Sequence, residues 1–193
     1  MLTGAVLAGG RSLRYGTNKA LEVFRGKRLI DRGVEALRPF CAPVLVVVND
    51  LSGYYDVQAT LVQDIVVQQG PLGGIYTALL FSPHEWVFVK ATDMPLLVPG
   101  LVDLMLNFIE GFDVVVPRVG DWYEPLFALY HRRCIPAIAE MLEGTDRKVA
   151  TLYKKVRVKS ISEKKWRSTD SEGLSFRNVN TPADWEHITD GTE

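Results

Sequence analysis

Residues 7–19, with the sequence LAGGRSLRYGTNK, place glycines and cations together in a way that could bind a phosphate group. The glycines allow backbone N–H groups to come close to an anion, and Arg11, Arg14 and Lys19 could neutralise its charge. The segment is not a P-loop, because the Gly-Lys-Ser/Thr ending is missing, and it also lacks the GxGxxG spacing. We expect a polyphosphate-binding loop of another kind. An ordinary glycine-rich surface loop is the alternative.

Asp93 is the clearest candidate metal ligand, because it follows the run 87–92 and precedes a Met-Pro pair. Proline prevents simple continuation of a strand, so this carboxylate is expected at a strand end. One or two carboxylates together with substrate phosphates usually hold Mg²⁺ in phosphoryl-transfer sites. No second metal carboxylate stands out, and we expect Asp93 to be the single protein ligand. A turn residue before a helix is the alternative.

Two further polar residues follow apolar runs. Asn49 comes after the run 44–48, and Asp64 comes after the short run 60–63. Ligands of a parallel sheet bind beyond the carboxyl ends of its strands, so both side chains could reach a ligand. Each could instead be an ordinary turn residue.

Two pairs of residues have a spacing that suggests a shared role. Asn178 and Asn180 lie two positions apart, and an extended segment would direct both amides to one side. Gly70 and Gly74 flank the predicted start of a helix. For all four residues, ordinary turn or capping chemistry is the alternative.

The elements that must position these residues follow from the pattern of apolar side chains. Apolar and β-branched runs predict strands at 4–8, 44–48, 60–63, 86–89, 113–116, 126–130 and 156–161. Apolar residues at helical spacing predict helices over 30–37, 71–80, 101–108 and 135–142, with another helix starting at 181. Strands that alternate with single helices predict a largely parallel α/β sheet with right-handed crossovers. The alternating pattern of 156–161 predicts an edge strand.

Composition limits the classes of protein that the chain can belong to. Its 193 residues, 47% of them hydrophobic, suit one globular domain spanning 1–193. A net charge of -1 argues against a general nucleic-acid binder, and no apolar run approaches the roughly 20 residues of a membrane span. Cys41 and Cys134 form neither a metal motif nor a disulfide framework. We expect a cytoplasmic protein, because no basic segment precedes the first apolar run as in a signal peptide.

The segment LAGGRSLRYGTNKAL resembles the signature of nucleotidyltransferases that make activated nucleotide conjugates, and especially of the molybdenum cofactor guanylyltransferases. Further matches follow in order along nearly the whole chain, at Asn49, GPLGG at 70–74, TDMP at 92–95, YEPL at 123–126 and NVNTP at 178–182. The resemblance implies a three-layer α/β/α, Rossmann-like nucleotidyltransferase fold with a mostly parallel sheet. It also implies transfer of GMP from MgGTP to the terminal phosphate of molybdopterin or its molybdenum-loaded form, with release of pyrophosphate.

The resemblance implies a site role for each matching residue, with the N-terminal part binding GTP and the C-terminal part binding molybdopterin. The residues implied in GTP binding are Leu7, Ala8, Gly9, Gly10, Lys19, Asn49, Asp64 and Asp93. Those implied in molybdopterin binding are Gly70, Gly74, Asn178 and Asn180. Catalysis would fall to Arg14, Lys19 and Asp93, with Mg²⁺ held by Asp93. The Asp64 carboxylate could accept from N1–H and the amino group of guanine together.

Two other functions remain open at this point. A cytidylyltransferase acting on molybdopterin or another phosphorylated metabolite would use the same motifs, and a non-catalytic nucleotide-binding module would share the fold. The presence of Lys19 and Asp93 argues against the module. Proteins that deliver the acceptor are possible partners, whereas nucleic acid and membranes are not expected. Lys90-Ala91-Thr92 stands where many relatives carry a small residue or cysteine, and we expect this departure to lie outside the chemistry.

Overall fold

The computed structural model describes residues 1–9, 18–24, 26–66, 69–180 and 184. Its central sheet has the strand order β10-β7-β9-β6-β1-β4-β5, and β8 pairs with β7. The strands are β1 (Thr3–Leu7), β4 (Val44–Val48), β5 (Thr60–Gln63), β6 (Trp86–Ala91), β7 (Val114–Val119), β8 (Trp122–Tyr123), β9 (Phe127–His131) and β10 (Val158–Ile161). A separate antiparallel pair consists of β2 (Val23–Phe24) and β3 (Lys27–Arg28).

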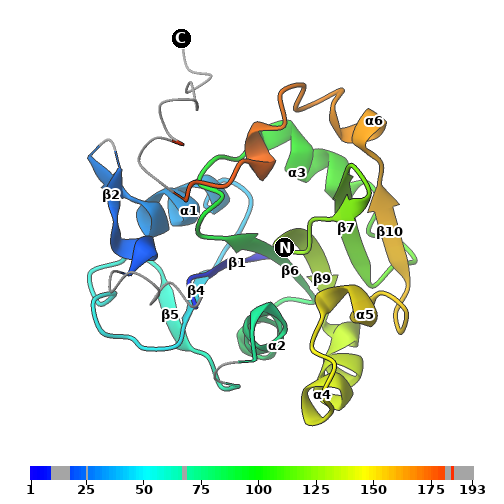
Figure 1. The fold of residues 1–193 in the computed structure, drawn as a ribbon, viewed down its shortest axis with the longest axis horizontal. Coiled ribbons are helices and arrows are strands. Elements are labelled where there is room, and N and C mark those ends of the chain that lie inside the picture. Colours follow the sequence, from blue (N-terminus) through cyan, green and yellow to red (C-terminus); the bar gives the residue numbers. More distant parts are fainter. Residues whose placement is uncertain (10–17, 25, 67–68, 181–183, 185–193) are drawn as a thin grey trace.

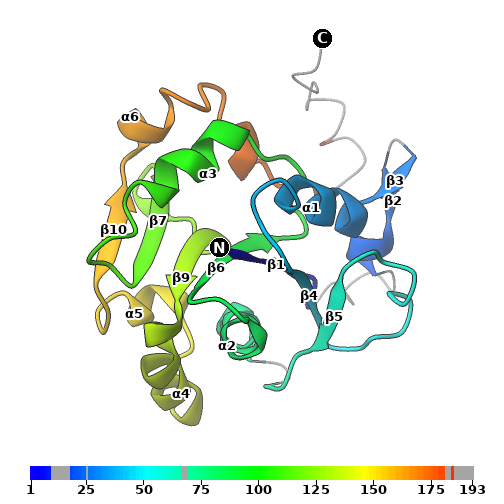
Figure 2. The ribbon, with the colours of Figure 1, turned by 180° about the vertical axis from the view of Figure 1, so that it is seen from behind.

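Helices cover both faces of the sheet, as Figures 1 and 2 show. One face packs against α1 (Leu29–Leu37), α3 (Pro99–Leu106) and α6 (Glu163–Trp166). The other packs against α2 (Pro71–Phe81), α4 (Ile135–Glu143) and α5 (Val149–Leu152). Short 3-10 helices occur at Lys19–Leu21, Arg132–Cys134 and Leu174–Phe176. The three-layer α/β/α architecture predicted from the sequence is confirmed.

The central strands are mostly apolar because each is buried on both faces, and Lys90 in β6 is a charged exception. Successive strand side chains point to opposite faces. In β6, Phe88 packs into the layer of α1 and α3, whereas Val89 packs into the layer of α2 and α4. Val6 and Ala5 divide in the same way in β1. A strand covered on both faces therefore appears in the sequence as a continuous apolar run.

The direction of the strands determines where a ligand can bind. β1 runs parallel to β4 and β6, β4 runs parallel to β5, and β7 runs parallel to β10. β9 is antiparallel to both β6 and β7, so β7 and β10 point the same way as β6. The carboxyl ends of all the long strands except β9 consequently lie along one edge of the sheet.

Most elements lie where the sequence predicts them. Each of α1, α2, α3 and α4 overlaps its predicted helix, and β10 is an edge strand as expected. The reversed direction of β9 was not predicted. It arises because β7 connects to β9 through the short strand β8 rather than through a crossover helix. The helix start expected at 181 lies outside the described residues.

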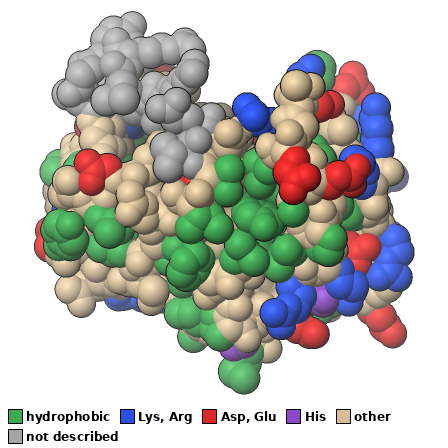
Figure 3. Space-filling view, turned by 90° about the horizontal axis from the view of Figure 1, so that it is seen from below, with side chains coloured by type: hydrophobic (Ala, Val, Ile, Leu, Met, Phe, Trp, Pro, Cys, Tyr) green, Lys and Arg blue, Asp and Glu red, His purple; other side chains and the backbone are tan. Residues whose placement is uncertain are grey.

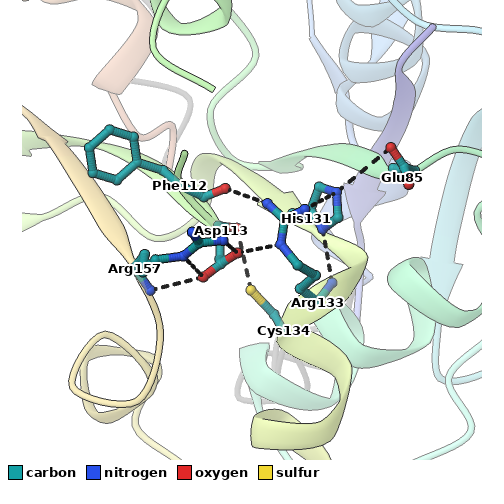
Figure 4. Close-up of polar contacts among 7 residues, drawn as sticks. All are labelled: Glu85, Phe112, Asp113, His131, Arg133, Cys134 and Arg157. Carbon is teal, nitrogen blue, oxygen red and sulfur yellow. Dashed lines mark hydrogen bonds and ion pairs between the residues drawn. The ribbon is translucent and has the colours of Figure 1, made fainter. Parts of the chain in front are cut away.

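A network of charged groups joins the strands at the edge opposite to those carboxyl ends (Figure 4). Asp113, immediately before β7, is 7% exposed. Its carboxylate accepts from Arg133 Nε at 2.6 Å and from Arg157 Nε and Nη2, each at 3.0 Å. Arg133 also donates through Nη2 to the carbonyl of Phe112 at 2.8 Å, and its backbone N–H donates to His131 Nδ1 at 3.0 Å. These contacts connect the start of β7, the end of β9 and the approach to β10.

The outer surface of the molecule is not uniformly polar, because several large hydrophobic side chains are exposed on it. Figure 3 shows hydrophobic side chains across the middle of the face seen from below, with charged side chains toward one side. Leu80 and Phe81, at the end of α2, are among the exposed hydrophobic residues. Within the described part of the chain, no helix is both long enough and apolar enough to cross a membrane.

Candidate active site

Several of the predicted site residues lie at or just past the carboxyl ends of β1, β4, β5 and β6; these are Leu7, Ala8, Asn49, Asp64 and Asp93. Backbone contacts extend the sheet just past these strand ends and fix the positions that follow them. Ala8 N donates to the Val47 carbonyl at 2.9 Å, and Asp64 N donates to the Val48 carbonyl at 2.7 Å. The Leu7 carbonyl accepts from both the backbone N–H of Thr92 at 3.2 Å and its Oγ1 at 2.8 Å. The turn after β6, which contains Asp93, is thereby held against the end of β1.

Lys19, Asp93 and Asn180 form a cluster from three distant parts of the chain. Lys19 Nζ donates to Asn180 Oδ1 at 2.7 Å and lies 3.5 Å from Asp93 Oδ2. The Asp93 side chain is 38% exposed, so its oxygens remain accessible to a ligand. Val179 N donates to the Asp93 carbonyl at 2.7 Å, which holds the C-terminal segment beside the turn. The structure therefore brings a residue assigned to the acceptor next to two residues assigned to the nucleotide.

Lys19 is positioned by the residue before it. Asn18 caps the short helix Lys19–Leu21, because its Oδ1 accepts from Ala20 N at 3.3 Å. Its amide also contacts the buried Tyr54 hydroxyl, at 2.9 Å from Nδ2 and 3.1 Å from Oδ1. Burial raises the pKa of Tyr54, so the phenol remains a neutral partner at ordinary pH. The sequence analysis assigned no role to Asn18 or Tyr54. Asparagine is a typical capping residue, and this was the only sequence signal for the role of Asn18.

Gly9 and Asn49 lie against each other beyond β1 and β4. Asn49 Nδ2 donates to the Gly9 carbonyl at 3.2 Å, and the Asn49 carbonyl accepts from Gln63 Nε2 at 3.2 Å. A Cβ atom on Gly9 would come within 3.2 Å of Asn49 Oδ1, which is tight for any larger residue. The two residues that the resemblance assigns to the nucleotide thus share one contact. Gly10 and Arg14 lie outside the described residues.

Asp64 is 7% exposed and already has partners inside the protein. Its Oδ1 accepts from Thr77 Oγ1 at 2.6 Å and from Val66 N at 3.1 Å. This carboxylate therefore links the end of β5 to helix α2. Its other oxygen makes no hydrogen bond to a described residue and lies 3.4 Å from where a Cβ on Gly73 would stand. Recognition of guanine by Asp64 stays a prediction. Only Oδ2 is left without a partner among the described residues, so only this oxygen could accept a hydrogen bond from guanine.

The two glycines assigned to the acceptor differ in structural role. Gly70 precedes α2 with φ of 66°, a positive value that glycine adopts without strain. Gly74 is buried, and a Cβ there would lie 3.2 Å from the Leu7 side chain, so it allows α2 to approach β1. Packing alone explains a glycine at 74. At Gly70, no atom of a described residue lies within 4 Å of the position that a Cβ would take.

The two asparagines near the C-terminus point to one side, as their spacing predicts. Asn178 and Asn180 are exposed, whereas Val179 between them is buried against Leu29 and Leu96. The apolar contact holds the segment while both amides remain available. Asn180 contacts Lys19 and is therefore at the cluster, but no described contact places Asn178 there.

Glu124 belongs to this edge of the sheet, although sequence reasoning gave it no role. It follows β8, and its backbone N–H donates to the Pro117 carbonyl at 2.9 Å. Burial raises the pKa of Glu124 to about 7; the N–H of Leu126 acts in the opposite sense and the negative charge of Asp93 adds to the rise. Its electrostatic interaction with Asp93 indicates proximity to the cluster. The match YEPL at 123–126 contains Glu124 and was the one sequence signal for it, although no role was assigned to it.

The side chains at this site are better suited to binding a metal ion that is already coordinated by substrate phosphates than to forming a complete metal site by themselves. Among the described residues, no group of three or more His, Cys, Asp or Glu side chains could hold an ion. Asp93 offers one partly exposed carboxylate beside the ammonium of Lys19. Mg²⁺ typically keeps several waters and binds through one or two carboxylates plus substrate phosphates. The site is therefore compatible with Mg²⁺ bound by Asp93 together with a nucleotide.

Comparison with known proteins adds a second line of argument. The family model described as "MobA-like NTP transferase domain" matches residues 4–159. "Molybdenum cofactor guanylyltransferase" of Desulfosudis oleivorans is 36% identical over 187 residues, covering 96% of this chain and 93% of that protein. "Probable molybdenum cofactor guanylyltransferase" of Pelotomaculum thermopropionicum is 38% identical over 182 residues, covering 94% and 89%. The crystal structure of molybdopterin-guanine dinucleotide biosynthesis protein A from Archaeoglobus fulgidus matches with a TM-score of 0.81 and 29% identity, covering 96% and 95%.

Proposed function

The chain belongs to the family with the MobA-like NTP transferase domain, and on this premise we propose that it is a molybdenum cofactor guanylyltransferase. It would transfer GMP from GTP to the terminal phosphate of molybdopterin, or of the molybdenum-loaded cofactor, and release pyrophosphate. The observation that carries the proposal is the cluster of Lys19, Asp93 and Asn180 at the carboxyl edge of the sheet. The names of the similar proteins support guanylyl transfer.

The reaction is an in-line displacement at the α-phosphorus of GTP. An oxygen of the acceptor phosphate forms the new bond to this phosphorus, and the bond to the bridging oxygen of the β-phosphate breaks. An ionised phosphate monoester is already nucleophilic, so no protein nucleophile is needed. Pyrophosphate leaves with the bonding electrons. Catalysis then consists of holding the two phosphates in line and stabilising the charge that develops.

Lys19 supplies the cation for the departing pyrophosphate. Its ammonium is a compact point charge on a flexible stem, suited to charge that moves during the reaction. Asp93 would hold Mg²⁺, which neutralises phosphate charge when bound. Arg14 and the backbone of Gly10 would complete the phosphate contacts from the loop.

The C-terminal segment is proposed to hold the acceptor beside the nucleotide. Asn180 contacts Lys19 directly, and the hydrogen bond from Val179 to Asp93 holds the two substrate regions together. Asn178 lies on the same side of this segment as Asn180. The positive φ of Gly70 and the start of α2 would bound the acceptor region from the other side.

Two observations favour guanine over cytosine as the base: the similar proteins are named guanylyltransferases, and the Asp64 carboxylate could accept hydrogen bonds from guanine. Asp64 Oδ2 could accept from guanine's N1–H or amino group, while Asn49 would contact the nucleoside. A cytidylyltransferase and a non-catalytic nucleotide-binding module remain the competing functions. GTP and molybdopterin are the proposed substrates, proteins that deliver the acceptor are candidate partners, and the cytoplasm is the proposed location.

A nucleotide panel tests the proposal. Molybdopterin is mixed with Mg²⁺ and one of GTP, CTP, ATP or UTP, and pyrophosphate release is measured. GTP is expected to react far faster than the other three. Preference for CTP would support the cytidylyltransferase, and nucleotide binding without pyrophosphate release would support the module.

A further inference from the structure

Lys90 is a buried amine in the middle of strand β6. Its side chain is 0% exposed, and its Nζ makes no hydrogen bond to any described residue. Val6 on β1 and Phe127 on β9 are its neighbours across the sheet. Both belong to the apolar layer against α1 and α3, so the lysine lies among hydrophobic side chains. A buried amine without a hydrogen-bond partner lowers stability, and an apolar residue of similar size would pack there without that cost.

The position of Lys90 relates this cost to the candidate site. It lies three residues before Asp93, on the strand whose end carries that carboxylate. Asp93 interacts with it electrostatically: burial lowers the pKa of Lys90 to about 7, and the charge of Asp93 acts in the opposite sense. Two lysines thus act on one carboxylate. Lys19 approaches from the open side of the site, and Lys90 from the interior.

We propose that Lys90 is a positioning residue whose buried amine supplies positive charge behind the polyphosphate site at Asp93. The inference rests on the proposed function, because it requires the cluster to bind a polyphosphate. A charge in the poorly polarisable interior acts more strongly on a nearby anion than a charge in water does. The strand also fixes the amine in advance, so no mobile side chain has to be ordered when the anion binds. Lys90 therefore complements Lys19, which contacts the site directly. This role departs from the expectation, made from sequence, that Lys90-Ala91-Thr92 lies outside the chemistry.

The test uses inorganic tripolyphosphate as the probe and the full-length protein. Lys90→Met retains the length of the side chain and removes its charge. Affinity for tripolyphosphate is measured by calorimetry in the presence of EDTA, at a pH below 7 so that most of the Lys90 amine is protonated, and thermal stability is measured on the same samples. Loss of one cation should weaken tripolyphosphate binding about tenfold, while the melting temperature stays equal or rises. If Lys90 had only a packing role, its replacement would not weaken tripolyphosphate binding while leaving the melting temperature equal or higher.

Two matched variants make the result specific. Lys159→Met removes a lysine from β10 at the sheet edge, where Nζ lies 4.8 Å from the Phe108 ring. It should leave tripolyphosphate affinity unchanged. Lys19→Met removes the direct contact and should weaken binding at least as much as Lys90→Met does.

Each outcome separates the inference from the proposed function. If Lys19→Met weakens tripolyphosphate binding and Lys90→Met does not, the inference about Lys90 is wrong and the proposed function stands. If neither variant changes the affinity, the proposal that this cluster binds a polyphosphate is wrong. Lys90→Leu serves as a second variant. Failure of both apolar variants to fold would also overturn the inference, because it requires that the amine lowers stability.

Discussion

At the scale of single residues, opposite and like charges meet around Asp93. Lys19 Nζ lies 3.5 Å from its Oδ2, and Lys90 acts on it from the interior. Glu124 adds a like charge, because the interaction with Asp93 contributes to the raised pKa of Glu124. The carboxylate nevertheless stays 38% exposed. A partly exposed anion beside cations is suited to binding a metal that carries phosphates.

Asp93→Ala is expected to abolish turnover, and Asp93→Asn to reduce it nearly as much, because Mg²⁺ would lose its anionic ligand. The fold should persist, since the side chain is partly exposed and its ion pair with Lys19 is long. Turnover at saturating Mg²⁺ and circular dichroism provide the measurements. A folded Asp93→Ala enzyme that kept more than about a tenth of wild-type kcat, a loss of only ~1.4 kcal/mol in barrier lowering, would refute the ligand role.

Lys19→Met is expected to weaken GTP binding or slow transfer by roughly 10²-fold or more, the usual effect of losing one charged transition-state contact. Guanosine has no phosphates, so its binding should change little. Binding of GTP and guanosine by the variant and by wild type is compared by calorimetry. Equal losses for the two ligands would place Lys19 away from the phosphates.

Asp64→Asn is expected to lower the use of GTP by about 1–3 kcal/mol in kcat/KM, because an amide donor would face the donors of guanine. Use of CTP and ATP, poor already, should change little. Thr77→Val is the matched control, since it removes the 2.6 Å hydrogen bond to Asp64 without altering the carboxylate. The control should lower stability and preserve discrimination. A uniform loss for all four nucleotides in Asp64→Asn would give Asp64 a structural, ribose or metal role instead.

At the scale of elements, the two edges of the sheet carry different tasks. The carboxyl ends of β1, β4, β5 and β6 carry candidate site residues. The opposite edge carries Asp113, which joins the start of β7 to Arg133 and Arg157. Hydrogen bonds from these two arginines hold the pKa of Asp113 well below its usual range, in spite of burial. The network therefore stabilises the strand ends that lie farthest from the chemistry.

Asp113→Asn is expected to lower the free energy of unfolding by about 1–3 kcal/mol at pH 7, with little effect on catalysis. The folded-state pKa of Asp113 is lowered, so its contribution is fully present above the unfolded pKa of about 3.9 and is lost progressively as pH falls from there through the folded-state pKa. Urea unfolding of wild type and variant from pH 7 to pH 3 should show the difference shrinking with acid. Asp121→Asn, at a fully exposed side chain, is the control and should have little effect at any pH. A difference independent of pH would show that the charge of Asp113 is not the cause.

At the scale of the whole molecule, the layers could be predicted from sequence, whereas several contacts between distant segments could not. Continuous apolar runs and helical spacing identify the buried strands and α1 to α4. The direction of β9 depends on the two-residue strand β8, which has too few residues to give a pattern. The contact of Lys19 with Asn180 joins residues 161 positions apart, and only the folded chain reveals it. The buried partners of Asp64 and the isolation of Lys90 are likewise properties of packing.

In the proposed reaction, the α-phosphate of GTP passes to the acceptor together with its nucleoside. The most direct test follows isotopic label from GTP marked at either the α- or the γ-phosphate, in a single turnover with molybdopterin. We expect α-label in the acceptor product, γ-label only in pyrophosphate, and the two products in equal amounts. Appearance of γ-label on the acceptor, or of pyrophosphate with no α-label in the acceptor product, would contradict it.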